Sequence, residues 1–182
     1  MKMKKTLLTM LIAAYLILNY TAASAQGKCK FYVDKTDPMT GKLHRATNVL
    51  IKSMGIFSAV IAWGIDFDRM GDDYSIVSRL VINTNSGEYL QQGDSLMIKL
   101  ESGKVLAVYA KSKISPKALN KPNEDPATNY ISTYPISIEN FKLLSSEKIL
   151  YFRINVGPLV FDQQMNEKAI PKLQNAAICI LQ

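Results

Sequence analysis

The strongest pattern in the chain is an alternation of apolar and less apolar residues between positions 56 and 82. Successive residues of a β-strand point to opposite sides of a sheet, so a period of two indicates a strand with one buried face. Residues 56–67 and 74–82 both show this period, and the turn-forming sequence 68–73 separates them. The three segments together predict a β-hairpin. Its apolar side is assigned to Ala59, Ile61, Trp63, Ile65, Phe67, Tyr74, Ile76, Ser78, Leu80 and Ile82.

Further segments have the composition of strands, and two have that of helices. A tight turn at 101–104, with Gly103 where a positive φ is needed, predicts a second hairpin. Ser137 is placed to cap a helix over 138–145, and a stripe of apolar residues predicts a last helix near 169–181. The remaining predicted strands are 28–34, 43–52, 96–100, 105–110 and 149–156.

About seven strands and two helices follow one another without the strand–helix–strand alternation of a parallel sheet. The chain is therefore predicted to form an α+β domain, mainly antiparallel β, with its helices packed on the sheet. Residues 112–129 contain several prolines and many charged side chains, and we expect no regular structure there. A segment of this kind is either functional or mobile.

The first 25 residues have the three parts of a secretory signal peptide. Early lysines precede an uncharged apolar run over 7–18, and Ala23-Ser24-Ala25 places small residues where signal peptidase requires them. The apolar run is shorter than the roughly 20 residues that cross a bilayer. We therefore expect cleavage after Ala25, a single domain over 26–182 without a transmembrane span, and a periplasmic or secreted location.

Charge and cysteine content add two constraints on the exported domain. The leader carries Lys2, Lys4 and Lys5 and no acidic residue, so its removal lowers the formal charge from +7 to +4. No basic run remains, and nucleic acid is not an expected partner. Cys29 and Cys179 both stay in the domain, where an oxidising compartment allows a disulfide. The alternative is two buried, unpaired thiols.

Two passages of the C-terminal half resemble a known group of proteins. Residues 93–106 contain two strand-like segments around a tight turn, and residues 137–154 contain a helix followed by a strand with Arg153 at its centre. Together they resemble small exported proteins of unknown function from Gram-negative gut bacteria. The resemblance implies a location in the cell envelope and assigns no catalytic residue.

A group of acidic residues lies between positions 66 and 73. Asp66, Asp68 and Asp72 offer the carboxylates that calcium prefers. Asp66, Asp68 and Gly71 occupy the first, third and sixth places of an EF-hand loop. Met70 and Val77 stand where that loop needs oxygen ligands, however, and strands replace its flanking helices. A solvated hairpin tip is the simpler interpretation. A pair of catalytic carboxylates in a small hydrolase is a third one.

Aromatic residues and one arginine form the second candidate site. Tyr134, Tyr151 and Arg153 are candidates for a face that binds a peptide or a sugar, because aromatic rings combine a large contact area with a polar tip. Tyr130 and Trp63 are related candidates. The same rings are equally suited to cap the core.

No catalytic residue is predicted. His44 is the only histidine, and no nucleophile motif accompanies it. Ser145 and Lys148 have the spacing of a serine acyl-enzyme pair but fall at a helix exit, without the partner motifs of such enzymes. One histidine and two cysteines are too few for a zinc site, so calcium is the only cofactor considered.

The leading hypothesis is a non-enzymatic binding or assembly module of the cell envelope, whose partner is an envelope protein or a glycan. Its expected recognition surface is the sheet face around Tyr151 and Arg153 or the segment 112–129. The alternative is a small hydrolase or calcium-dependent protein that uses the acidic cluster. A third hypothesis is strand addition to a larger assembly at an exposed sheet edge.

The leader predicts that the protein purified from its native host begins near Gln26. Intact-mass spectrometry of that material measures this directly. A mass that includes Met1 and the apolar run would contradict processing by signal peptidase.

Overall fold

Two antiparallel β-sheets and two helices make up the protein, which confirms the predicted α+β, mainly β class. The computed structural model describes residues 29–53, 60–82, 88–119 and 127–182. The expected leader, residues 1–25, lies outside the described residues. Within the described part there is no helix of sufficient length and apolar character to span a membrane.

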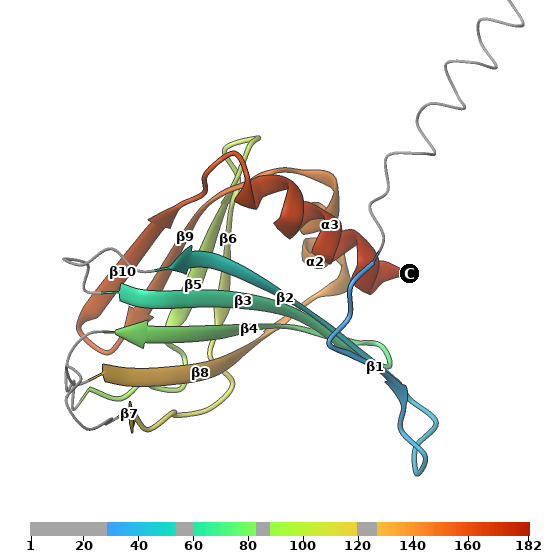
Figure 1. Cartoon of the computed structure of the whole chain (residues 1–182), viewed down its shortest axis with the longest axis horizontal. Coiled ribbons are helices and arrows are strands. Elements are labelled where there is room, and N and C mark those ends of the chain that lie inside the picture. Colours follow the sequence, from blue (N-terminus) through green and yellow to red (C-terminus); the bar gives the residue numbers. More distant parts are fainter. Residues whose placement is uncertain (1–28, 54–59, 83–87, 120–126) are drawn as a thin grey trace, which may run out of the picture.

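The larger sheet has six strands in the order β1-β2-β3-β4-β8-β7 (Figure 1). The smaller sheet has four, in the order β10-β9-β5-β6. The strands of the larger sheet are β1 Val33–Thr36, β2 Leu43–Ser53, β3 Val60–Met70, β4 Asp73–Ile82, β7 Lys117–Leu119 and β8 Ala127–Ile136. Those of the smaller sheet are β5 Ser95–Leu100, β6 Val105–Tyr109, β9 Ile149–Val156 and β10 Leu159–Gln164.

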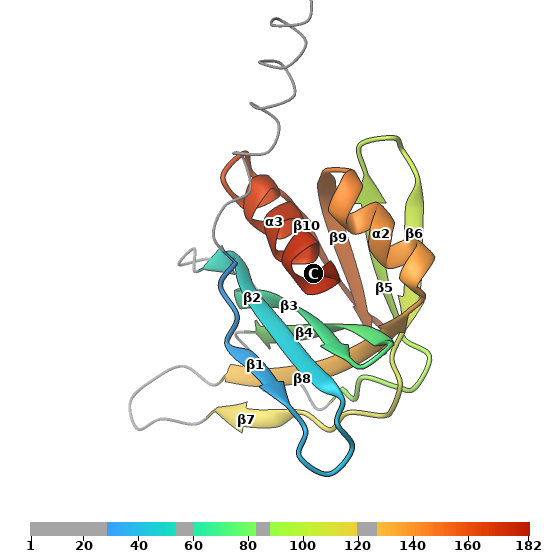
Figure 2. The same cartoon turned by 90° about the vertical axis from the view of Figure 1, so that its right-hand side faces the viewer.

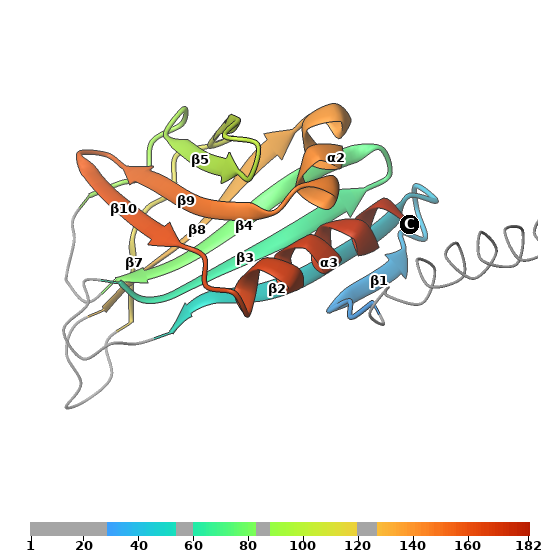
Figure 3. The ribbon, with the colours of Figure 1, turned by 90° about the horizontal axis from the view of Figure 1, so that it is seen from above.

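The helices α2 (Ile138–Ser146) and α3 (Ala169–Leu181) confirm the two predicted ones. The Ser137 side chain accepts a hydrogen bond from the Asn140 backbone N–H, as expected of a helix cap. Figure 3 shows α3 running along β2, and α3 also contacts β3, β9 and α2. In Figure 2 both helices lie at the end where the two sheets diverge.

The core forms where the inner sides of the two sheets face one another. Trp63 and Phe67 of β3 project inward as the alternation predicts, and both are fully buried. The Trp63 ring lies 6.3 Å from that of Phe152 on β9, which joins the two sheets. The Phe67 ring meets Phe141 of α2 edge to face at 5.6 Å. One continuous apolar cluster therefore connects both sheets with the helix layer.

The described part of the chain contains three strands that the sequence pattern does not reveal: β7, β8 and β10. The expectation that 112–129 lacks regular structure is wrong, because it contains β7 and the start of β8. The inward positions of β8 include Thr128 and Ser132, so hydrophobicity does not alternate there. Pro135 is tolerated because β7 pairs β8 only over 127–129, which leaves that edge of β8 unpaired at Pro135.

The disulfide between Cys29 and Cys179 is confirmed, with its Cα atoms 5.6 Å apart. It joins the first described residue to α3 across 150 positions of sequence. Cys179 is buried against the core. The bond therefore holds the N-terminal segment, and with it β1, to the helix layer.

Replacing both cysteines by serine should lower the free energy of unfolding by about 3–5 kcal/mol, because the bond closes a very long loop of the unfolded chain. Urea denaturation of the wild-type and doubly substituted proteins measures the difference. Wild-type protein with reducing agent should match the double variant. Two reactive thiols in unreduced protein would contradict the bond itself.

Candidate functional site

The outer face of the four-stranded sheet is the main candidate for a recognition surface. The strand register places its outward residues in three rows, each with one residue from β10, β9, β5 and β6. Eight of these residues are exposed, including Val105 at 53% and Tyr109 at 58%. The rows are Val160, Asn155, Ser95 and Tyr109; Asp162, Arg153, Met97 and Ala107; and Gln164, Tyr151, Lys99 and Val105.

Arg153 is held in place on this face by Asp162. Its Nε and Nη2 atoms donate to the two carboxylate oxygens of Asp162 at 2.7 and 2.9 Å, in a two-point contact between β9 and β10. The hydrogen bond from Arg153 lowers the pKa of the Asp162 carboxyl, so the pair stays charged at neutral pH. Hydrogen bonding to Asp162 raises the pKa of Tyr151 above its usual value. The three side chains therefore have defined positions before any partner binds.

A hollow of about 200 Å³ lies next to this group. Its lining residues are Met97, Lys99, Val105, Tyr151 and Arg153. Met97 and Val105 contribute apolar side chains to the lining, and the hydrocarbon stems of Lys99 and Arg153 add to that apolar surface. Tyr151 and Arg153, which the sequence analysis assigns to one face, thus line one accessible hollow in the structure.

The prediction that Tyr134 belongs to the binding face is wrong, because it occupies an inward position of β8 and is fully buried. The Ser132 hydroxyl donates to the Tyr134 hydroxyl at 3.0 Å, and burial raises the pKa of Tyr134 to about 12. Trp63 and Tyr130 are core residues as well: their polar atoms bond Ser78 Oγ and the Glu88 carbonyl, both at 2.9 Å.

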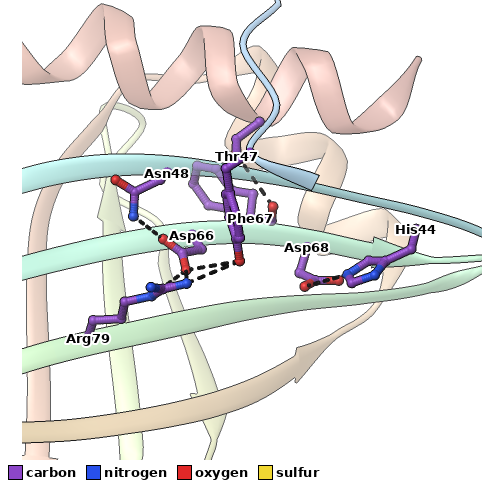
Figure 4. A network of polar contacts seen from close by, with 8 residues as sticks. His44, Thr47, Asn48, Asp66, Phe67, Asp68 and Arg79 are labelled. Carbon is purple, nitrogen blue, oxygen red and sulfur yellow. Dashed lines mark hydrogen bonds and ion pairs between the residues drawn. The ribbon is translucent and has the colours of Figure 1, made fainter. Parts of the chain in front are cut away.

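The acidic cluster does not converge into one site. Asp66 is fully buried, and Arg79 Nε and Asn48 Nδ2 donate to its carboxylate (Figure 4). Asp68 faces His44 instead, with Nε2 3.2 Å from its carboxylate. Asp72 lies in the two-residue turn between β3 and β4 and is exposed. In residues 29–53, 60–82, 88–119 and 127–182, no three histidine, cysteine or acidic side chains are grouped to hold a metal ion.

A network of polar side chains surrounds Asp66 in the six-stranded sheet. Burial raises the pKa of the Asp66 carboxyl, and the hydrogen bond from Asn48 and the charge of Arg79 oppose that shift. Arg79 also donates from Nη2 to the Tyr32 hydroxyl at 3.1 Å and lies over the Tyr32 ring. Asp66 therefore joins the N-terminal segment to β2, β3 and β4, which is a structural role.

The serine and lysine considered as an acyl-enzyme pair are engaged with other groups. Ser145 Oγ donates to the Lys142 carbonyl at 2.7 Å, and Lys148 Nζ lies 2.7 Å from Glu101 Oε1. Neither contact activates a nucleophile.

Sequence reasoning missed Asp162, Met97 and Val105 as parts of the candidate surface. Met97 and Val105 lie on strands that were predicted correctly, but their pairing across β5 and β6 was not used to extend the face. Asp162 lies on β10, where a mixed pattern of partly exposed residues gives little periodic signal. An acidic residue on the other side of the Gly157 turn from Arg153 is the signal in the sequence that would have revealed Asp162.

No family model, curated protein or solved structure matches this chain. The resemblance of its C-terminal half to exported proteins of gut bacteria remains a prediction.

Replacing Arg79 by methionine should lower the free energy of unfolding by about 3 kcal/mol at pH 7, because it leaves the buried Asp66 carboxylate without its cation. A buried carboxyl with a raised pKa favours the fold below its ordinary pKa, and this stability is lost as the pH rises through the raised value. The loss should therefore shrink as the pH is lowered from 7 towards 4, and urea denaturation across that range measures it.

The matched control is Arg153→Met, which breaks an exposed ion pair and should cost less than about 1 kcal/mol. Adding Asp66→Asn to Arg79→Met should recover part of the loss, because no buried charge then remains. If Arg79→Met and Arg153→Met lowered the free energy of unfolding equally at pH 7, the Asp66 network would stabilise the fold no more than an exposed ion pair does.

Proposed function

We propose that the protein is exported to the cell envelope and acts there as a non-enzymatic binding module, which holds a partner protein on the outer face of its four-stranded sheet. The observation that carries the proposal is the preformed hollow beside Tyr151 and Arg153. It offers an apolar side chain of the partner a pocket, with Arg153 fixed at its rim by Asp162.

Export is supported by two independent features of the chain. The first 25 residues have the form of a signal peptide. The Cys29–Cys179 disulfide fits an oxidising compartment, because such bonds are rare in the cytosol of most organisms.

The composition of the outer face favours a protein partner over a glycan. The face combines apolar side chains with three charged ones, Asp162, Arg153 and Lys99. Val105, Tyr109 and Val160 are all more than half exposed. Interfaces between proteins combine an apolar centre with a polar rim and are rich in tyrosine and arginine. Sugars need several free hydrogen-bonding groups beside an aromatic ring, whereas Arg153 and Asp162 satisfy each other here.

The test compares Val105→Glu with Ile131→Glu in quantitative capture from the envelope fraction of the native host. Val105 lines the hollow, whereas Ile131 is similarly exposed (49%) on the outward side of β8. A glutamate in the hollow should reduce recovery of a specific envelope protein about tenfold or more, and the control should leave it unchanged.

Three results would contradict the proposal. Recovery could be equal for both variants, which would remove the hollow from recognition. An immobilised envelope glycan could be retained by the wild type and lost by Val105→Glu, which would make the surface a glycan site. Sedimentation could show that only the protein's own dimer depends on Val105.

A further inference from the structure

The edge of β2, in the six-stranded sheet, has a stretch that pairs with no other described strand. The short strand β1 pairs with β2 only over Leu43–Ala46, although β2 continues to Ser53. In an antiparallel pair, alternate residues of a strand direct both backbone groups to the same side. The Ala46 carbonyl accepts from Tyr32 N–H on the β1 side, so the backbone groups of Asn48 and Leu50 also point that way. Neither has a backbone partner on that side among residues 29–53, 60–82, 88–119 and 127–182.

This unpaired edge forms one wall of a groove of about 390 Å³, and α3 forms the other. Four consecutive residues of β2, Thr47–Leu50, line the groove. Because successive side chains of a strand point to opposite faces, this pattern indicates that the strand borders the groove with its backbone edge. From α3, residues at a spacing of one helical face complete the lining: Lys172, Asn175, Ala176 and Cys179. Figure 1 shows α3 running above this part of β2.

The walls of the groove are held rigidly. The α3 side is anchored by the Cys29–Cys179 disulfide and by buried residues such as Leu173 and Ala177. The β2 side is paired with β3 from His44 to Leu50, and Asn48 is fixed by its hydrogen bond to Asp66. Little order would therefore have to be gained on binding, which favours affinity.

The charges around the groove select the chemistry of its occupant. Lys30, from the N-terminal segment, and Lys172, from α3, both line the groove. Among the described lining residues none is acidic. Neither lysine forms an ion pair with another described residue. Val49, Leu50 and Ala176 provide apolar contact between the two charges.

We propose that an extended peptide segment of a partner protein binds in this groove, adds a strand to the edge of β2, and places a carboxylate between Lys30 and Lys172. Backbone hydrogen bonds to Asn48 and Leu50 supply affinity that does not depend on sequence, as in other cases of strand addition between a strand edge and a helix. The two lysines supply selectivity for an aspartate, a glutamate or a free C-terminus. This site is separate from the outer face of the four-stranded sheet.

The experiment selects binders from a displayed library of random heptapeptides on the whole mature protein, and then measures their affinities by fluorescence anisotropy. Enriched sequences should carry acidic residues next to β-branched ones. Lys172→Glu should weaken binding of the selected acidic peptides about fivefold to tenfold. Lys104→Glu, the same charge change in the exposed β5–β6 turn, should leave binding unchanged.

The backbone contact has its own matched pair of variants. Leu50→Pro removes one edge N–H, which an edge strand tolerates, and should weaken binding about tenfold. Leu50→Ala also shortens the side chain but keeps that N–H, so the selected peptides should bind it about fivefold more tightly than Leu50→Pro. Circular dichroism and thermal melting establish that each variant is folded.

Several outcomes would overturn the proposal. Selection could enrich no acidic peptides, or the selected peptides could bind Lys172→Glu as tightly as the wild type. Equal affinities for Leu50→Pro and Leu50→Ala would show that the peptide does not pair with β2. Loss of binding in Val105→Glu with no effect of Lys172→Glu would place the peptides on the four-stranded sheet instead, which supports the proposed function and removes this second site.

Discussion

The structure depends on the burial of one side of each sheet against the other. Because a strand sends alternate side chains to opposite sides, residues such as Trp63 and Phe152 can meet in the core only if their neighbours face outward. The surfaces considered for binding follow from this constraint. Tyr151 and Arg153 flank the buried Phe152 on β9, so the packing that hides Phe152 also exposes them.

The two sheets diverge at one end, and the helices occupy the space between them. The position of α3 along β2 leaves the backbone edge of Asn48 and Leu50 beside the helix, without a backbone partner among the described residues, and this creates the groove. The disulfide fixes this arrangement, because it ties α3 to the segment that leads into β1. A short edge strand such as β1 usually protects a sheet from unwanted pairing, and here it covers only the first part of β2.

Polar groups inside the sheets are satisfied locally. Tyr32, Asn48 and Arg79 all donate hydrogen bonds to the Asp66 carboxylate. These contacts connect the N-terminal segment with β2, β3 and β4. Within the described residues, no buried side-chain nitrogen or oxygen lacks a hydrogen-bond partner. Two of the three carboxylates that the sequence suggests as metal ligands, Asp66 and Asp68, therefore bind neighbouring side chains of the sheet. They are close in sequence, but Asp66 and Asp68 bind different partners.

The sequence by itself determined the class of the fold, both helices and the two cysteines available for a bond. It also determined the hairpins β3–β4 and β5–β6, which it predicts over 56–82 and 96–110. These features are local: periodicity, turn residues and helix caps act over a few positions. Tertiary structure decided which sheet each strand joins and therefore which tyrosines are accessible, since Tyr134 is fully buried whereas Tyr151 is only partly buried. It also decided the Asp162 contact to Arg153 and the part of the β2 edge that no described strand covers, because both depend on pairing between strands that no local pattern specifies.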